Sequence, residues 1–264
     1  MTTGMSTIVI AKSCMSVNKP LPPMWIRPDW PAPATVQAIS TSRHGGVSCA
    51  PWASLNLGNH VDDSPEAVAH NRAIVRQYLP ADPIWLSQVH GVQVVDAATA
   101  RQNAEADAIT AHTVNAVCAV MTADCLPVLL CNQAGTVVGA AHAGWRGLCG
   151  GVIEAAIKQM NIPPDTLMAW LGPAIGPRAF EVGAEVRAAF MAHDNTSASA
   201  FKPSANTGKW LVDIYLLAKQ RLQASGVHAI YGGDYCTVTD SDRFFSYRRD
   251  QCTGRMASLI WLTE

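Results

Sequence analysis

Three residues with metal-binding side chains stand where apolar segments break into turns. His90 lies between SQV and Gly91, Cys125 follows Asp124 in VMTADCLPVLL, and His142 follows the apolar run VVGAA. Imidazole nitrogen and thiolate sulfur are ligands that zinc prefers, and a catalytic zinc keeps a fourth position open for water or substrate. If these segments end at one edge of a sheet, His90, Cys125 and His142 form a three-ligand set of that kind.

The spacing of these residues leaves other interpretations open. Positions 90, 125 and 142 are too far apart for a local motif of the zinc-finger kind. A histidine at the end of a strand is often a hydrogen-bonded structural residue instead. The same residue types also suit a cysteine hydrolase, in which Cys125 is the nucleophile and His142 or His90 is the base. A thiol of low pKa without a bound metal would favour that alternative.

Asp124 is an acid beside a thiol in an otherwise apolar stretch. A charge at the edge of a core costs free energy unless it is paired, hydrogen-bonded or kept for chemistry. Asp124 could exchange a proton with water at the metal, or it could orient a ligand histidine. Alternatively, it caps nearby backbone amides and stabilises a turn. The catalytic residues expected from these segments are Asp124, Cys125 and His142.

Two further segments carry side chains suited to anions and to flat rings. HAGWRGLCGG places Arg146 and several glycines before a predicted helix, a combination that favours phosphate, although it matches no nucleotide-binding fingerprint. The segment FFSYRRD supplies three aromatic rings and two arginines, namely Phe244, Phe245, Tyr247, Arg248 and Arg249. The rings could stack on a base while the arginines contact phosphate or ribose, or the rings could fill the core.

The elements that position these residues can be predicted from hydrophobic period and turn residues. Ser64 at a helix N-cap and Pro65 behind it predict a helix over 64–79. Further helices are expected over 152–160 and from Trp210 to a stop at Gly226, the latter with an apolar face of Leu211, Ile214, Tyr215, Ala218 and Leu222. Strands are expected at 84–89, 92–95, 114–121, 128–130, 136–141, 227–231 and 256–262. Strands and helices do not alternate strictly, which favours an α+β fold.

The composition favours a small-molecule partner. Of 264 residues, 49% are hydrophobic and 15% charged, with a formal net charge of -1, so neither nucleic acid nor a membrane is an expected partner. No apolar run approaches the roughly 20 residues that span a bilayer. The N-terminal segment lacks a long apolar centre and the eight cysteines are scattered, which indicates a cytoplasmic protein with free thiols. Residues 1–23, ending in several prolines, are expected to form a disordered extension before a single catalytic domain over 24–264.

Six segments, taken in order, resemble one known family. They are STSRHGGVSCAPWASLNLGNHV, LSQVHG, TADCLPVLL, AAHAGWRG, LGPAIGPRAFEVG and CTVTDSDRFFSYRRDQCTGRMASLIWL. The chain is similar over residues 40–262 to the laccase-domain proteins variously called YfiH, polyphenol oxidase or purine nucleoside phosphorylase. The resemblance implies a four-layer α/β/β/α fold with mixed sheets, and one zinc ion held by His90, Cys125 and His142.

The resemblance also implies an activity. It implies phosphorolysis of adenosine, inosine, guanosine and methylthioadenosine, with deamination of adenosine in the same pocket, by a monomer or homodimer. The expected substrate-binding residues are Arg43 and Asn56, which match pocket positions of the family, with Arg146, Tyr247 and Arg248. A copper polyphenol oxidase is less expected, because copper oxidases need clusters rich in histidine. A peptidoglycan-precursor editing enzyme is a further alternative.

The chain departs from the family pattern in two loops. Asp62 stands where a glycine is usual after His60 and Val61, and Gln251 and Cys252 stand where the family more often has a glycine and another residue. Neither departure touches the three expected metal ligands. The expected effect is therefore on the local shape of these loops.

Overall fold

The computed structural model describes residues 20–264. The prediction of a disordered extension over residues 1–23 therefore lies largely outside the described residues. Within the described part, Leu21 packs against a core cluster that includes Trp25, and Trp25 N donates to Pro22 O at 2.9 Å.

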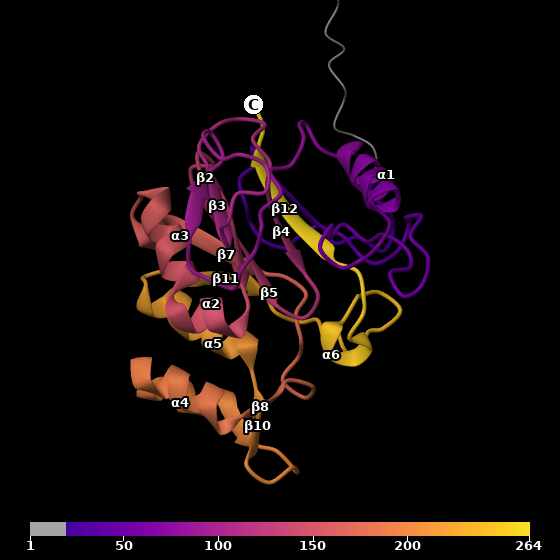
Figure 1. Cartoon of the computed structure of the whole chain (residues 1–264). Helices are drawn as coiled ribbons and strands as arrows, with labels where there is room; N and C mark the ends of the chain where they lie inside the picture. The colour runs from indigo at the N-terminus through magenta and orange to yellow at the C-terminus, as the bar shows by residue number, and fades with distance from the viewer. Residues whose placement is uncertain (1–19) are drawn as a thin grey trace, which may run out of the picture.

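A mixed six-stranded sheet forms the centre of the molecule (Figure 1). In order across the sheet, its strands are β11 (Ala229–Gly232), β7 (Leu167–Leu171), β5 (Leu126–Asn132), β6 (Val138–Ala143), β3 (Ala108–Ala111) and β2 (Val94–Asp96). The pairs β11/β7 and β2/β3 are parallel and the other pairs are antiparallel. Strand β4 (Cys118–Thr122) and strand β5 follow each other in the chain but belong to different sheets, so the turn between them lies where the sheets separate.

A second, antiparallel sheet packs on one face of the six-stranded sheet. Its strands are β1 (Val36–Ser40), β12 (Met256–Leu262) and β4, with β12 in the middle. Helices α2 (Trp145–Gly150), α3 (Val152–Met160) and α5 (Ile214–Ala224) cover the other face of the six-stranded sheet, and α1 (Pro65–Arg76) covers the outer face of the second sheet (Figure 1). The expected α+β, four-layer α/β/β/α arrangement is confirmed.

Period-two alternation along the strands separates three buried clusters. In β5, Val128 and Leu130 face the helices, whereas Leu129 faces the second sheet. In β12, Ile260 faces the six-stranded sheet and Leu259 faces α1. Successive side chains of a strand point to opposite faces, so each strand contributes to two clusters. Each internal sheet is therefore buried on both faces, which explains why β4, β5, β6 and β12 are buried at every position.

A smaller unit lies beside the layers. Its elements are β8 (Glu181–Gly183), α4 (Ala184–His193), a 3-10 helix (Asn195–Ala200), β9 (Phe201–Pro203) and β10 (Lys209–Val212). Another 3-10 helix, Pro164–Thr166, precedes β7. Helix α6 (Tyr247–Asp250) precedes β12. Phe190 and Phe201 of this unit join the helix-side core, which ties the unit to the main fold.

Most predicted elements occur, and two predictions are corrected. Residues 84–89 do not form a strand, because Ile84 and Ser87 make only isolated bridges. Side-chain amides here replace the backbone hydrogen bonds of a strand pair. Gln88 Nε2 donates to Met121 O and Gln88 Oε1 accepts from Met121 N, while Gln102 Oε1 accepts from Trp85 N. The helix expected from Trp210 begins later, at Ile214, because residues 209–212 pair as β10. Asp213 accepts from Leu216 N and so caps the helix at that point.

No helix within residues 20–264 is both long and apolar enough to cross a membrane.

Candidate metal centre

The fold brings His90, Cys125 and His142 together. His90 lies in the turn before β2, Cys125 in the turn between β4 and β5, and His142 near the end of β6. One ligand atom from each residue lies within 4.8 Å of the others, and no other group of this kind occurs in residues 20–264. Cys125 Sγ lies 3.7 Å from His90 Nε2. The imidazole rings of His90 and His142 are arranged edge to face, with their centroids 4.8 Å apart. Two imidazoles and one thiol form a donor set that fits zinc.

Asp107, a residue that the sequence analysis missed, holds both histidines in place. Its carboxylate is fully buried and accepts from His142 Nδ1 at 2.8 Å. It also accepts from the consecutive backbone amides of Val89, His90 and Gly91, at 3.2, 2.9 and 2.6 Å. A carboxylate on one ring nitrogen of a histidine leaves the other nitrogen free to bind a metal and sets its direction. The signal in the sequence was an acid inside the apolar run ADAITA.

Charge coupling between Cys125 and His142 stabilises a thiolate and an imidazolium, and a metal ion would displace the extra proton from the His142 ring. Burial raises the pKa of the Cys125 thiol, but the charges and hydrogen bonds of His142 and His90 outweigh burial and lower that pKa to about 6. Burial lowers the pKa of His142, but Cys125 and Asp107 outweigh burial and raise that pKa to about 9. Cys125 is therefore a thiolate at neutral pH, which is the form that binds metals.

The backbone approaches closely to His90, Cys125 and His142, which we call the metal group. A Cβ atom on Gly144 would lie 2.8 Å from His90 Cδ2 and 3.0 Å from Cys125 Sγ, so only glycine fits there. His90 and Asp124 both have left-handed backbone conformations, with φ of 62° and 90°. Non-glycine residues rarely adopt this region and are commonly held there at functional sites. Three amide bonds to Asp107 hold the turn at His90 in this conformation.

Both carboxylate oxygens of Asp124 already have protein donors. Thr237 Oγ1 donates to Oδ1 at 2.6 Å, and Arg248 N donates to Oδ2 at 2.6 Å. Asp124 O also accepts from Ile175 N at 2.9 Å. These contacts tie the turn at Cys125 to the loop before α6. They favour the turn-stabilising interpretation of Asp124 over the proton-transfer interpretation.

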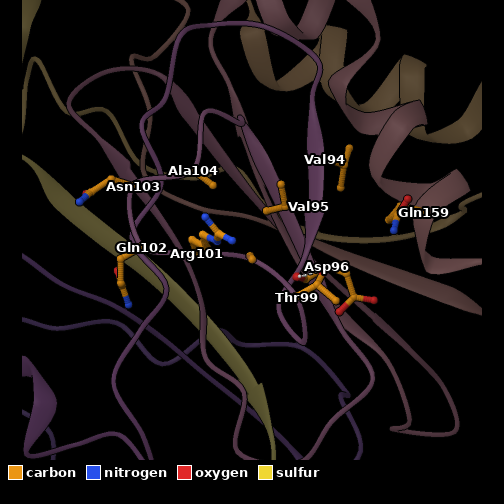
Figure 2. A pocket seen from close by; sticks show the side chains of 10 residues that line it. Val94, Val95, Asp96, Thr99, Arg101, Gln102, Asn103, Ala104 and Gln159 are labelled. Carbon is orange, nitrogen blue, oxygen red and sulfur yellow. Dashed lines mark hydrogen bonds between the residues drawn. The ribbon is translucent and has the colours of Figure 1, made fainter.

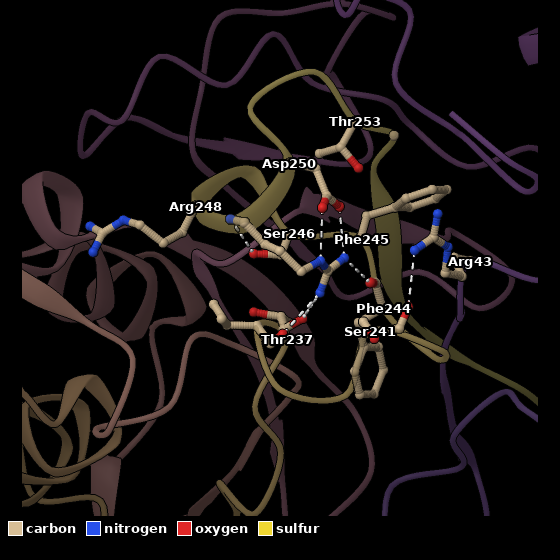
Figure 3. A network of polar contacts seen from close by, with 12 residues as sticks. Arg43, Thr237, Ser241, Phe244, Phe245, Ser246, Arg248, Asp250 and Thr253 are labelled. Atoms are coloured by element: carbon tan, nitrogen blue, oxygen red, sulfur yellow. Dashed lines mark hydrogen bonds and ion pairs between the residues drawn. The ribbon is translucent and has the colours of Figure 1, made fainter. Parts of the chain in front are cut away.

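The segment around α6 separates into core rings and outward side chains. Phe244 and Phe245 are fully buried, which supports the interpretation that they fill the core, whereas the side chain of Tyr247 is 52% exposed. Arg248 Nη1 donates to Glu181 O at 2.9 Å. Figure 3 shows Arg248 extending away from the network of Arg43, Thr237, Ser241 and Asp250. Tyr247 and Arg248 are therefore exposed at the surface, where Arg248 is held by Glu181 O, and the two buried rings are not exposed.

Arg43 and Asn56 act within the protein framework in this structure. Arg43 Nε and Nη1 donate to Ala53 O and Ser241 O, and the guanidinium lies over the Phe245 ring at 4.9 Å. Asn56 is fully buried, and its Oδ1 accepts from Gly58 N and Arg255 N, both within 2.9 Å. Asn56 therefore fixes the position of Arg255, a residue that the sequence analysis did not single out.

Arg146 is exposed on the first turn of α2, and its guanidinium stacks over Trp145 at 4.5 Å. Helix α2 packs closely on the turn at His90, since a Cβ atom on Gly147 would lie 2.8 Å from Gly91 O. Arg146 therefore lies on the surface next to one ligand turn.

One cavity lies away from the metal group. It has a volume of about 610 Å³ and lies between β2, the loop 97–104 and α3 (Figure 2). Asp96, Arg101 and Gln159 are among the residues that line it, and no residue of the metal group does.

Comparison with known proteins shows one family. The family described as "Multi-copper polyphenol oxidoreductase laccase" matches residues 37–263. A purine nucleoside phosphorylase of Pseudomonas aeruginosa is 56% identical and covers 91% of this chain and 99% of its own. The purine nucleoside phosphorylase YfiH of Escherichia coli is 55% identical and covers 90% and 98%. A solved structure from Neisseria meningitidis, assigned to the family DUF152, is 53% identical, with a TM-score of 0.88 over 91% of this chain and 99% of that one.

Proposed function

We propose a zinc-dependent purine nucleoside phosphorylase activity for this chain, which belongs to the family described as multi-copper polyphenol oxidoreductase laccase. The proposed substrates are adenosine, inosine, guanosine and methylthioadenosine, with hydrolytic deamination of adenosine as a second reaction. The observation that carries the proposal is the convergence of His90, Cys125 and His142 on one point. The names of relatives more than half identical to this chain support the purine nucleoside class.

The chemistry of the three ligands supports zinc. A zinc ion held by His90, Cys125 and His142 would act as a Lewis acid on an oxygen at its fourth position. The chain itself supplies the Cys125 thiolate, the two histidine side chains, and the Asp107 carboxylate that orients His142. One group of three ligands is far fewer than a multi-copper oxidase needs, which argues against the copper alternative within the described residues.

Phosphorolysis makes two demands on the protein. A phosphate oxygen forms a bond to C1′ of the ribose while the bond between C1′ and the purine nitrogen breaks, and its electron pair leaves with the base. The protein must hold a phosphate dianion beside the ribose, and it must contact the purine. We assign the Tyr247 ring to the purine base. Tyr247 is exposed, and it directly precedes Arg248, whose backbone amide donates to Asp124 beside Cys125.

The proposal is tested by metal analysis and by base release. Purified protein should contain about one zinc per chain, and it should release hypoxanthine from inosine only when phosphate is present. Ammonia release from adenosine without phosphate measures the deamination reaction separately. Copper in place of zinc with oxidation of phenols, or no phosphate-dependent base release from any of the four nucleosides, would contradict the proposal.

One observation favours a second candidate function, a cysteine hydrolase. Cys125, His142 and Asp107 form a thiolate, an imidazole and an orienting carboxylate in series, which is the arrangement of a nucleophilic triad. A triad does not need a second histidine at the sulfur, yet His90 Nε2 lies 3.7 Å from it. That second histidine is why we rank metal binding first.

A further inference from the structure

The loop 56–60 is held between two arginines from distant parts of the chain. On one side, Leu57 N donates to Arg255 O at 3.1 Å and Arg255 N donates to Asn56 Oδ1 at 2.8 Å. On the other side, Nε and Nη2 of Arg72, on α1, donate to Leu57 O at 3.0 and 2.9 Å. The loop therefore gathers Arg72, Arg255 and its own His60 into one region.

The two arginines lie near His90, Cys125 and His142. Arg72 Nη2 lies 3.9 Å from Met121 Sδ, on the strand that leads directly to Cys125. Burial lowers the pKa of His60, and the charges of Arg255, Arg72, His142 and His90 lower that pKa further. Burial also lowers the pKa of Arg255, against the opposing influence of the Cys125 and Asp124 charges. These mutual influences require the cations and the ligand side chains to lie close together, because interactions between charges fall off with distance.

Neither arginine has a carboxylate partner. The ion pairs of residues 20–264 include neither Arg72 nor Arg255, although both side chains are partly buried. Arg255 Nη1 donates to Thr253 O and Gly254 O, which leaves its Nε and Nη2 without a partner in the described chain. A partly buried cation without a counter-charge is costly, and an oxyanion would supply that charge. The planar fork of arginine suits phosphate oxygens in particular.

We propose that Arg255 and Arg72 form the binding site for inorganic phosphate, the attacking substrate of the reaction. This inference rests on the proposed phosphorylase function and assigns its second substrate to named residues. It differs from the expectation that Arg146 and the glycines before α2 bind phosphate. Arg146 lies exposed and stacked on Trp145, whereas Arg255 is fixed by Asn56 and aimed by two backbone carbonyls.

The kinetic test compares arginines that carry the same charge. In Arg255→Met, the KM for phosphate in inosine phosphorolysis should rise about tenfold or more, because a charged hydrogen-bonding partner is lost, while the KM for inosine changes little. Arg27→Met is the matched control, since Arg27 is exposed and bonds only Gln37. Arg146→Met tests the rival site: a larger rise in the phosphate KM there than in Arg255→Met would overturn the proposal.

A second variant moves Arg255 without removing a charge. A Cβ atom on Gly58 would lie 2.8 Å from Arg255 Cγ, so Gly58→Ala should displace that side chain. We expect Gly58→Ala to raise the phosphate KM as Arg255→Met does, and Arg255→Lys to restore part of the affinity. Thermal unfolding of each variant identifies any that fail to fold. If Arg255→Met or Gly58→Ala does not fold, the phosphate KM of Arg255→Lys is compared with that of the wild type instead.

Direct binding separates this inference from the proposed function. Calorimetric titration of the zinc-loaded full chain with inorganic phosphate should show binding that weakens at least tenfold in Arg255→Met and is unchanged in Arg27→Met. If phosphate binds in this Arg255-dependent way but no nucleoside is cleaved, the proposed function fails and the phosphate site stands. If nucleosides are cleaved with phosphate but Arg255→Met binds phosphate as the wild type does, the site assignment is overturned.

Discussion

At the residue scale, one buried carboxylate organises the metal group. Asp107 accepts from the ring of His142 and from the backbone of the His90 turn, so it sets the direction of one ligand and the position of another. Asp107→Asn keeps the shape and removes the charge. We expect it to lower zinc affinity about ten- to hundredfold, the usual cost of losing such a partner of a metal ligand. Competition with a chromophoric chelator measures this directly.

The control for this prediction is Asp96→Asn. It removes the same charge from β2, where the Asp96 carboxylate accepts a hydrogen bond from Ala98 N in the following turn. Equal zinc affinities in Asp107→Asn and the wild type would show that the carboxylate does not support the ligands.

Cys125 gives a prediction that depends on pH. Its pKa is lowered to about 6, so in zinc-free protein the thiolate fraction, and with it the rate of alkylation by iodoacetamide, should rise through about pH 6 and level off above it. Zinc should slow this reaction strongly, because the sulfur is then bound to the metal. Peptide mass spectrometry follows Cys125 separately from exposed Cys49 and Cys252, which should react in both states.

Buried Cys131, whose pKa burial raises to about 12, serves as the unreactive internal reference. Fast alkylation of Cys125 in the zinc-loaded protein, with full activity surviving chelation beforehand, would support the cysteine hydrolase instead.

Asp124 can be assigned by comparing two variants. Asp124→Asn is expected to leave zinc bound and to lower turnover. If the residue only fixes the turn, Thr237→Val, which removes the donor to Oδ1 and keeps the carboxylate, should lower turnover by a similar factor of about ten. We expect this result, because both oxygens are engaged. A loss of about a hundredfold in Asp124→Asn alone would match the removal of a general acid or base and restore the proton-transfer interpretation.

The convergence of His90, Cys125 and His142 could be predicted from the sequence, but the residues that support them could not. His90, Cys125 and His142 each interrupt an apolar run, and that signal is local. Asp107 also interrupts an apolar run, yet its partners lie 17 and 35 residues away, so its role depends on how β3 pairs with β6. Arg255 gives no local signal, because its position depends on Asn56, which lies 199 residues away.

At the element scale, the two departures from the family pattern coincide with unusual backbone. Asp62 has φ of 62° and Gln251, which ends α6, has φ of 58° with ψ of -65°. Glycine adopts such conformations without the penalty that a Cβ atom brings. Aspartate tolerates the left-handed region, whereas glutamine has no comparable local compensation. These dihedral angles explain why glycine is usual at the two positions, and the expected change in loop shape stays a prediction.

Gln251 therefore gives a stability prediction. Gln251→Gly should raise the free energy of unfolding by about 1 kcal/mol, because it relieves a strained conformation at the end of α6. Gln133→Gly is the matched control, since Gln133 is exposed in a turn and its φ is not positive. Glycine there should be neutral or destabilising, because it only adds freedom to the unfolded chain. Urea denaturation compares the two, and equal shifts in both variants would exclude relief of strain.

Element boundaries depended on contacts that local patterns do not contain. The start of the helix predicted over 64–79 is confirmed, because its N-cap Ser64 accepts from Ala67 N, but the helix ends at Arg76. Residues 84–89 have the apolar composition of a strand, but the side chains of Gln88 and Gln102 take the backbone bonds that a neighbouring strand would make. These side-chain hydrogen bonds join residues that lie 17 and 33 positions apart in the sequence.

At the scale of the whole molecule, the metal group lies where two sheets part. The chain leaves the second sheet at the end of β4 and enters the six-stranded sheet at β5, and Cys125 occupies that crossing. His142 comes from β6, which pairs with β5, so its distance to the crossing is fixed by the register that places His142 opposite Pro127. The four-layer architecture therefore places His142 on a strand and His90 and Cys125 in turns beside strands, while the loop at 56–60 holds Arg72 and Arg255.

The N-terminal boundary of this architecture gives the last prediction. A chain that begins at Pro20 should unfold with the same free energy as the full chain and keep its activity, as expected for an extension outside the fold. A chain that begins at Met24 also loses Leu21, which packs beside Trp25, and the Pro22 carbonyl that accepts from Trp25 N. Because a partly buried leucine contributes about 1 kcal/mol, this shorter chain should be less stable by that amount and still active. Urea denaturation of both chains, with Leu21→Ser in the longer one as the matched variant, measures the contribution; failure of the Pro20 chain to fold would instead make residues 1–19 part of the folded unit.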